Sequence, residues 1–101
     1  MLVKLGQADI ETKLSEIVDW STDDNKWIVR KYRFTEFLQG IAFVNKVARL
    51  AEANNHHPMI AIDYKTVTLR LTSWHAGGLT ELDFSTAAQF DEAFAEMKVA
   101  H

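Results

Sequence analysis

The stretch that decides the fold is residues 56–72, HHPMIAIDYKTVTLRLT. Apolar residues alternate with other residues in both halves of it: Ile60, Ile62 and Tyr64, then Val67, Leu69 and Leu71. Such alternation is typical of β-strands with one buried face. The stretch therefore predicts a half-buried antiparallel hairpin with its turn near Lys65. That turn lacks an Asn-Gly type of signal, so the local sequence does not specify its register.

A histidine pair, His56 and His57, comes directly before this hairpin and is followed by Pro58. Pro58 fixes its own φ and disfavours the helical region for the residue before it, so the pair lies where a helix ends and a strand begins. Two adjacent imidazoles can serve as acid and base near neutral pH, although adjacent histidines also occur in ordinary surface loops. Placement favours a functional site, because three of the four histidines flank the hairpin (His56, His57 and His75) and only His101 does not.

The first third of the chain predicts a helix and a second hairpin. Asp9 is a candidate N-cap for a helix that ends near Trp20 and has helical spacing of its apolar residues, Ile10, Leu14, Ile17 and Val18. A strand is expected over residues 27–34, with a hairpin mate near residues 18–22. Its apolar face holds Ile28, Tyr32 and Phe34. Arg30 interrupts this face and needs either an edge position or a partner.

Two more helices are predicted on either side of the central hairpin. Thr35 is a plausible N-cap for a long helix with a broad apolar stripe, which consists of Phe37, Ile41, Val44, Ala48 and Ala51, widened by Phe43, Val47 and Leu50. After the hairpin, Gly77 and Gly78 are expected to break the second strand. Thr80 and Asp83 then resemble a capping box, with Asp in place of Glu, for a last helix that turns Phe90, Phe94 and Met97 inward.

The predicted order is helix, strand, strand, helix, strand, strand, helix. The simplest arrangement is an α+β two-layer domain spanning residues 1–101, with a four-stranded antiparallel sheet and three helices packed on one face. The 101 residues are 48% hydrophobic and 25% charged, as in an ordinary globular protein. One modest core is what a chain of this length can build.

Composition excludes several classes of function. The formal net charge is -3 and the eleven Lys and Arg residues are scattered, which argues against direct binding of nucleic acid. With no Cys, thiolate metal sites and Cys nucleophiles are excluded. No segment has the apolar length of a membrane span or the pattern of a signal peptide, so a cytoplasmic location is expected.

Antiparallel pairing brings the start of the first hairpin strand beside the end of the second, so residues near His57 and near Trp74 should be neighbours. In a regular strand, Trp74 and His75 point to opposite faces, and only one of them can face a shared site. Asp83 could reach the same end of the sheet, and it could equally act only as a helix cap. Zinc ligation is not expected, because neither a His-x-x-x-His pair nor a Cys pair is present.

These residues are similar to the signature of the pterin-4a-carbinolamine dehydratases. The similarity rests on Glu52, His56-His57-Pro58, Tyr64, Trp74 and Asp83, and it extends upstream through Trp20, residues 30–34, Phe37 and Phe43. It implies a four-stranded sheet with helices on one face, assembled as a homodimer or homotetramer. It also implies dehydration of 4a-hydroxytetrahydropterin to quinonoid dihydropterin, in tetrahydropterin recycling, with neither a metal nor an organic cofactor.

Carried over to this chain, the resemblance implies a catalytic set and a pocket. His56 is the candidate general acid, His57 the candidate base or ring-binding partner, and Asp83 the residue that orients a histidine or binds the pterin. The implied substrate-binding residues are Glu52, Asn55, Pro58, Ser73, Trp74, His75 and Ala76. Many members carry a third histidine where this chain has Trp74, so we expect an active enzyme with a narrower or slower acid repertoire.

Two other functions stay open. Animal members also act as dimerisation partners of a homeodomain transcription factor, which implies a protein-interaction role through a helical surface. A catalytically weak pterin-binding protein is the second alternative, with Trp74 stacking on the ring. An enzyme requires the histidines and converts the substrate, an interaction module is indifferent to His57→Ala, and a pterin-binding protein binds the ring without normal turnover.

Overall fold

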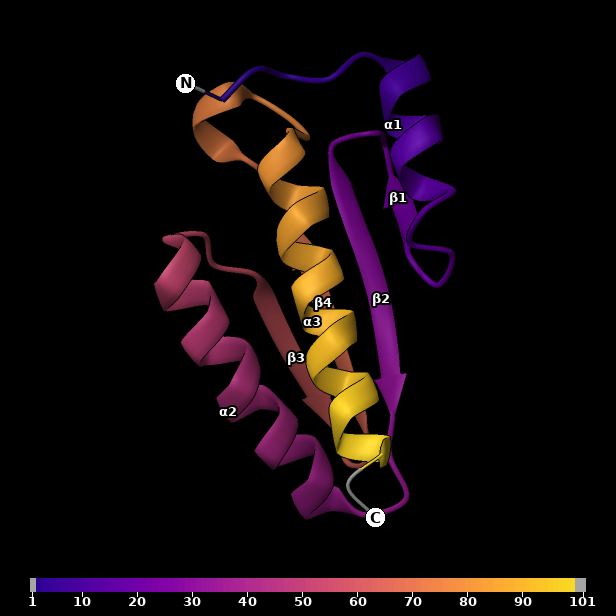
Figure 1. Cartoon of the computed structure of the whole chain (residues 1–101), viewed down its shortest axis with the longest axis vertical. Helices are drawn as coiled ribbons and strands as arrows, with labels where there is room; N and C mark the ends of the chain where they lie inside the picture. Colours follow the sequence, from indigo (N-terminus) through magenta and orange to yellow (C-terminus); the bar gives the residue numbers. More distant parts are fainter. Residues whose placement is uncertain (1, 100–101) are drawn as a thin grey trace.

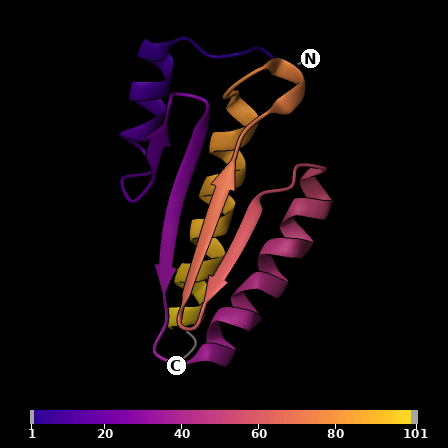
Figure 2. The same cartoon turned by 180° about the vertical axis from the view of Figure 1, so that it is seen from behind.

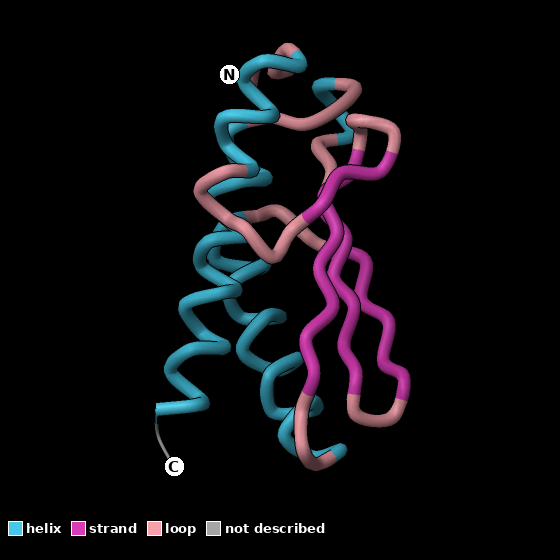
Figure 3. The backbone as a smooth tube through the Cα atoms, turned by 90° about the vertical axis from the view of Figure 1, so that its right-hand side faces the viewer, coloured by secondary structure: helices cyan, strands magenta, loops and turns pink. Residues whose placement is uncertain are grey.

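The chain follows the expected order of helices and strands in a computed structural model that describes residues 2–99 (Figure 1). The elements are α1 (Gln7–Leu14), β1 (Ser21–Asp23), β2 (Trp27–Arg33), α2 (Phe37–Asn54), β3 (Met59–Asp63), β4 (Thr66–Leu71), the 3-10 turn η1 (Trp74–Ala76) and α3 (Glu81–Val99). The four strands form one antiparallel sheet in the order β1-β2-β4-β3 (Figure 2). The helices lie to one side of this sheet, so the predicted α+β layering is confirmed (Figure 3).

The core lies between the sheet and the two long helices. Strand β4 alternates as predicted, with Val67, Leu69 and Leu71 fully buried, and β2 contributes Ile28 and Tyr32. The helices add Phe43 and Val47 from α2 and Ala87 and Phe90 from α3, and Phe94 and Met97 pack against this cluster. The other side of the sheet, which none of the helices within residues 2–99 covers, is called the open face below.

Arg30 interrupts the helix-facing side of β2 and finds its partner on α3. Its Nη1 donates to Asp91 Oδ1 at 2.7 Å, and its guanidinium lies 4.2 Å from the centre of the Tyr32 ring. The same carboxylate accepts hydrogen bonds from the Tyr32 hydroxyl and from Trp20 Nε1. Burial and the adjacent Asp91 carboxylate raise the pKa of the Tyr32 hydroxyl well above its usual range. A polar cluster therefore ties β2 to α3 inside an otherwise apolar layer.

Strand β3 differs from the expectation of a half-buried strand. All five of its residues are exposed, with Ile60 at 39% and Ile62 at 41%, and Tyr64 beyond it is also exposed. The cause is position, because β3 lies at the edge of the sheet and, among the described strands, pairs only with β4. Residues 64 and 65 form the turn between Asp63 and Thr66, and Tyr64 accommodates it with φ +52°.

The first helix is shorter than predicted. It begins after Gly6 and ends at Leu14, so Asp9 lies in its first turn and is not its N-cap. Residues 15–20 continue as tight turns closed by hydrogen bonds from Ile17 N–H to Leu14 and from Trp20 N–H to Ile17. Ile10 and Ile17 are buried as expected, whereas Val18 is exposed. The hairpin partner of β2 is residues 21–23, so it overlaps the expected stretch of residues 18–22 but begins three residues later.

The second helix begins one residue later than predicted. Glu36 is its N-cap, and the Gln39 side chain accepts the Glu36 N–H, whereas the Thr35 hydroxyl bonds to Gln39. The buried stripe of α2 consists of Gly40, Phe43, Val47 and Ala51. Phe37 and Ala48, which the periodicity assigned to the buried face, are exposed. Helix α2 packs against both β4 and α3, and these two contacts determine which of its side chains face inward. Burial on two sides agrees with the broad apolar stripe of this helix.

Candidate active site

The histidine pair stands at the junction that Pro58 predicts. Helix α2 ends with Asn55 in the left-handed conformation at φ +48°, and the His56 N–H donates back to the Ala51 carbonyl at 3.0 Å. An Asn accepts this conformation more readily than most residues, so it reverses the chain at low cost. His56 and His57 then lead into β3, beside the end of β4.

His56 is buried and held by a carboxylate. Its Nε2 lies 2.6 Å from Oδ1 of Asp83, a residue with no exposed surface. A hydrogen bond that involves a charged group is short and strong, and it fixes the plane of the ring. His56 and Asp83 are 27 residues apart in sequence, and their contact joins the end of α2 to the start of α3.

The second oxygen of Asp83 is also fully occupied. Oδ2 accepts the Ser73 hydroxyl at 2.8 Å and the Thr80 N–H at 2.9 Å. The bond from the Thr80 N–H to the Asp83 carboxylate is the capping interaction that the sequence predicts. The Thr80 hydroxyl makes a different contact and lies 2.8 Å from the Ser73 hydroxyl. Three donors compensate for removing this carboxylate from water. Asp83 therefore caps α3 and orients His56 at the same time.

His57 has a different environment. Its Nε2 lies 2.5 Å from Oε2 of Glu52, one helical turn back on α2, and 56% of its side chain is exposed. Glu52 is itself mostly exposed. A contact between two exposed side chains is screened by water and contributes little to stability. The two imidazoles are therefore distinct, one rigid and buried, the other accessible.

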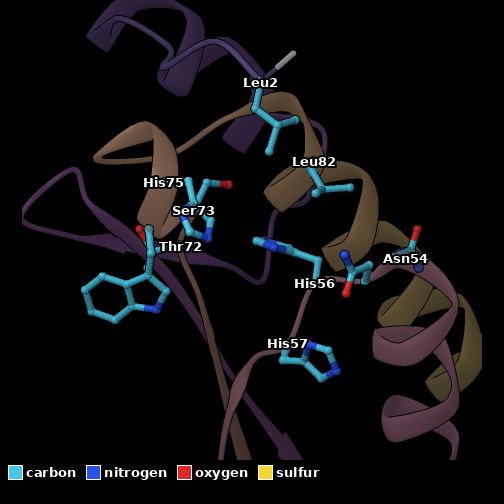
Figure 4. Close-up of a pocket in the computed structure, with 10 residues that line it drawn as sticks. Leu2, Asn54, His56, His57, Thr72, Ser73, His75 and Leu82 are labelled. Carbon is cyan, nitrogen blue, oxygen red and sulfur yellow. The ribbon is translucent and has the colours of Figure 1, made fainter.

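Both rings border a hollow of about 590 Å³ at this end of the sheet. Its lining consists of Leu2, Asn54, Asn55, His56, His57, Thr72, Ser73, Trp74, His75 and Leu82. The His56 ring points toward Ser73 on the facing segment, and the His57 ring lies lower and points away from it (Figure 4). Small-molecule sites are typically clefts of this size with a few polar groups. The predicted meeting of residues near 57 and near 74 is confirmed.

Trp74 and His75 do not follow strand alternation, because β4 ends at Leu71 and both lie in η1. The glycines therefore do not break the strand; Gly77, at φ +79°, ends the 3-10 turn instead. The Ser73 carbonyl accepts the N–H groups of residues 76, 77 and 78, which closes the loop on itself. As a result Trp74 and His75 both line the hollow, because the regular strand that would have turned one of them away ends at Leu71.

Some expected residues support the hollow without lining it. Asp83 lies behind His56, Glu52 contacts His57, and neither Pro58 nor Ala76 is part of the lining. Four lining residues were not predicted from the sequence: Leu2, Asn54, Thr72 and Leu82. Position carries a signal for three of them, because Asn54 ends a helix, Thr72 follows the end of a strand and Leu82 lies in the opening turn of α3. His101 lies outside the described residues.

Two further observations concern residues 2–99. Their His, Asp and Glu side chains form no group of three or more that could hold a metal ion. None of the helices described is long and apolar enough to cross a membrane.

The site combines an imidazole fixed by a buried carboxylate, a second accessible imidazole, and an indole at the rim. It defines a small α+β protein with two carboxylate-paired imidazoles beside a hollow of ligand size. The sequence model described as pterin 4 alpha carbinolamine dehydratase matches residues 3–93. The chain belongs to this family.

Individual relatives agree with that assignment. A "Putative pterin-4-alpha-carbinolamine dehydratase" of Picosynechococcus sp. is 46% identical over 92 residues, covering 91% of this chain and 99% of that protein. A protein of the same name from Chloroflexus aurantiacus is 51% identical, covering 88% of this chain and 95% of its own length. The crystal structure of a transcriptional coactivator/pterin dehydratase from Brucella melitensis has a TM-score of 0.85 and 26% identity, covering 89% of this chain and 97% of that chain.

Proposed function

We propose that this protein dehydrates 4a-hydroxytetrahydropterin. In this reaction the C4a–O bond breaks, N5 loses its proton, and a C4a=N5 double bond forms, giving quinonoid dihydropterin and water. The family supports the reaction class. The observation that carries the proposal is the contact of His56 with buried Asp83 at the edge of a hollow that His57 also lines.

In the proposed mechanism His56 is the general acid. A protonated His56 ring donates Nε2–H to Asp83, and its Nδ1–H is then the proton that can pass to the departing hydroxyl. Asp83 holds the ring in one orientation and stabilises its positive charge. A positioned acid of this kind typically contributes about 10² to 10⁴ in rate.

His57 is the proposed base for the N5 proton. Its exposure allows it to exchange that proton with water after each turnover, and Glu52 beside it stabilises the imidazolium that forms. Trp74 offers an indole face for the flat pterin ring, and the polar groups of Asn55 and His75 are available to its edges. We propose no role in proton transfer for Pro58 or Ala76.

The test is turnover of 4a-hydroxytetrahydropterin by the wild type, His56→Ala, His57→Ala and His75→Ala. We expect His56→Ala and His57→Ala each to lower kcat by about 10² or more. His75→Ala is expected to act mainly on KM. Equal rates in all four proteins would overturn the catalytic proposal. Normal binding of an oxidised pterin by a wild type without turnover would identify a pterin-binding protein instead.

A second candidate function is a protein-interaction module. Phe37 and Leu38 on α2 are exposed apolar residues, and the Brucella melitensis protein of similar fold is described as a transcriptional coactivator as well as a pterin dehydratase. Under this alternative Leu38→Lys abolishes function in a partner assay while His57→Ala has no effect. The dehydratase proposal requires the reverse for turnover.

We further propose that the chain is a homo-oligomer that uses β3. An exposed edge strand presents unpaired N–H and C=O groups, and Ile60 and Ile62 add apolar side chains to that edge. Antiparallel pairing of β3 with the β3 of a second copy would satisfy both. The resemblance implies a dimer or a tetramer. The exposed edge strand supports the pairing of two copies, which is needed in either case.

A further inference from the structure

A second, smaller hollow adjoins the candidate active site. It measures about 190 Å³ and is lined by Lys26, Trp27, Thr72, Trp74, Gly77 and Gly78. Thr72 and Trp74 also line the larger hollow, so Trp74 stands between the two. A ligand in the larger hollow could therefore extend past this indole into the smaller one.

Trp27 determines where the Trp74 indole stands. The two ring centres are 5.1 Å apart with an interplanar angle of 85°, an edge-to-face contact. Trp74 is 75% exposed, so it has few other neighbours to hold it. Edge-to-face aromatic pairs stabilise each other beyond the area that they bury. A residue of β2, distant from the histidines in sequence, thus sets one wall of the site.

Trp27 is itself held on the open face of the sheet. The Arg70 guanidinium lies 5.0 Å from the centre of the Trp27 ring, a cation–π contact, and Arg70 donates to Asp23 Oδ2 at 2.9 Å. Asp23 is the partner of Trp27 in the pairing of β1 with β2. Neighbouring strands therefore fix the Trp27 side chain, and it can act as a rigid support.

The chemistry of the smaller hollow suits a short hydroxylated chain. The volume of 190 Å³ equals the share of about six water molecules in the liquid, which is room for a few carbons with their hydroxyls. Lys26 offers ammonium donors, and the indoles cover the carbon atoms. The Thr72 hydroxyl already donates to the Lys26 carbonyl, so its oxygen is left to accept.

We propose that Trp27 is a specificity-determining residue and that the smaller hollow takes the substituent at C6 of the pterin, a hydroxylated chain of about three carbons. The inference rests on the proposed function, because the bicyclic ring must occupy the larger hollow. Trp27 touches no reacting atom, so its influence falls on binding of the substituent. Its signature is therefore a change in KM that depends on the substrate's side chain.

The experiment compares two 4a-hydroxytetrahydropterins, one with a 6-methyl group and one with a 6-trihydroxypropyl group. The wild type, Trp27→Ala and Trp27→Phe are assayed with both. Trp27→Ala is expected to raise KM for the trihydroxypropyl substrate about five- to tenfold more than for the methyl substrate, and Trp27→Phe is expected to restore most of the preference. Tyr64→Asn is the matched control, since it removes an exposed ring at the far end of β4 and Asn tolerates the positive φ there.

Calorimetric titration with the corresponding oxidised pterins keeps the inference testable without turnover. If the wild type converts both substrates and Trp27→Ala leaves their KM ratio unchanged, the inference fails while the proposed function stands. If the wild type converts neither substrate, the proposed function fails. In that case, calorimetry in which the wild type binds the trihydroxypropyl pterin no tighter than the methyl pterin would overturn the inference too. Tighter binding of the trihydroxypropyl pterin by the wild type, lost in Trp27→Ala, would support it.

Discussion

Asp83, which has no exposed surface, holds Nε2 of His56 at 2.6 Å and caps helix α3 with its other oxygen. The His56 ring is thereby fixed before any ligand arrives. Preorganisation of this kind lowers the cost of reaching the reactive geometry. His57 has no such support, because its partner Glu52 is exposed. This asymmetry between the two histidines leads to the first two predictions.

Asp83→Asn should lower kcat by about 10² or more, because the amide cannot stabilise a His56 imidazolium. It should also lower the free energy of unfolding by about 1 to 3 kcal/mol, since the donors of Ser73 and Thr80 lose a charged acceptor. Single-turnover rates on protein shown by circular dichroism to be folded separate the two effects. Glu81→Gln, an exposed change two residues away, is the control. A kcat within threefold of the wild type for Asp83→Asn would contradict this role.

Glu52→Gln should have a much smaller effect, a loss in kcat of less than about fivefold. The Glu52–His57 pair is exposed, and pairs of this kind contribute about 0 to 1 kcal/mol. Raising the salt concentration should reduce the difference between the wild type and Glu52→Gln further. A loss as large as that of Asp83→Asn would mean that the accessible pair is as preorganised as the buried one.

Stability at alkaline pH should depend on Tyr32. Burial and the Asp91 carboxylate raise its pKa in the folded protein, so above about pH 10 the unfolded chain loses this proton while the folded chain keeps it. The contribution of Tyr32 is therefore complete below about pH 10 and decreases as the pH rises, by up to about 1.4 kcal/mol per pH unit. Urea denaturation from pH 9 to 11 should show a steeper decline for the wild type than for Tyr32→Phe. Parallel declines would exclude Tyr32 as the cause.

Asp91→Leu should lower the free energy of unfolding by about 3 kcal/mol, because it leaves Arg30, Tyr32 and Trp20 without their common acceptor. The triple variant Arg30→Met, Tyr32→Phe, Asp91→Leu should recover part of that loss, since apolar groups of similar size can replace a buried polar cluster. Equilibrium denaturation of the single and triple variants measures both values. A triple variant less stable than Asp91→Leu would show that the polar cluster has no apolar substitute.

Ile62→Lys should shift the protein toward the monomer in light scattering at micromolar concentration. The substitution puts a charge on the exposed edge strand, a change that opposes strand-to-strand association. Val18→Lys, at an exposed apolar residue outside the sheet, should leave the oligomeric state unchanged. A wild type that is monomeric at the same concentration would remove the proposed β3 interface.

Sequence patterns predicted the sheet, the order of elements and most of the core, because the apolar period of 2 is clear over β4 and the period of 3.6 is clear over α2. They misjudged β3, since periodicity shows which side chains share a face and not whether another element covers that face. They also misplaced the start of α2 by one residue, where Gln39 and not Thr35 supplies the capping contact to the Glu36 N–H.

At the site, the motif indicated the two histidines and Asp83, and antiparallel pairing placed Trp74 near them. It could not show that β4 stops at Leu71, which is what brings Trp74 and His75 to the same hollow. Trp27 and Leu2 were beyond reach for another reason. Their proximity to the site depends on how distant segments pack, and no local pattern records it.

The position of Asp83 also has a consequence for synthesis. The contacts that organise His56 come from the opening turn of α3, and α3 follows all four strands of the sheet in sequence, so it emerges from the ribosome after them. During translation the sheet can pair while the histidine is still unsupported, so competence to bind ligand should arise only when α3 docks. A nascent chain stalled before α3 would expose the core face of its sheet to chaperones and would lack a finished pocket.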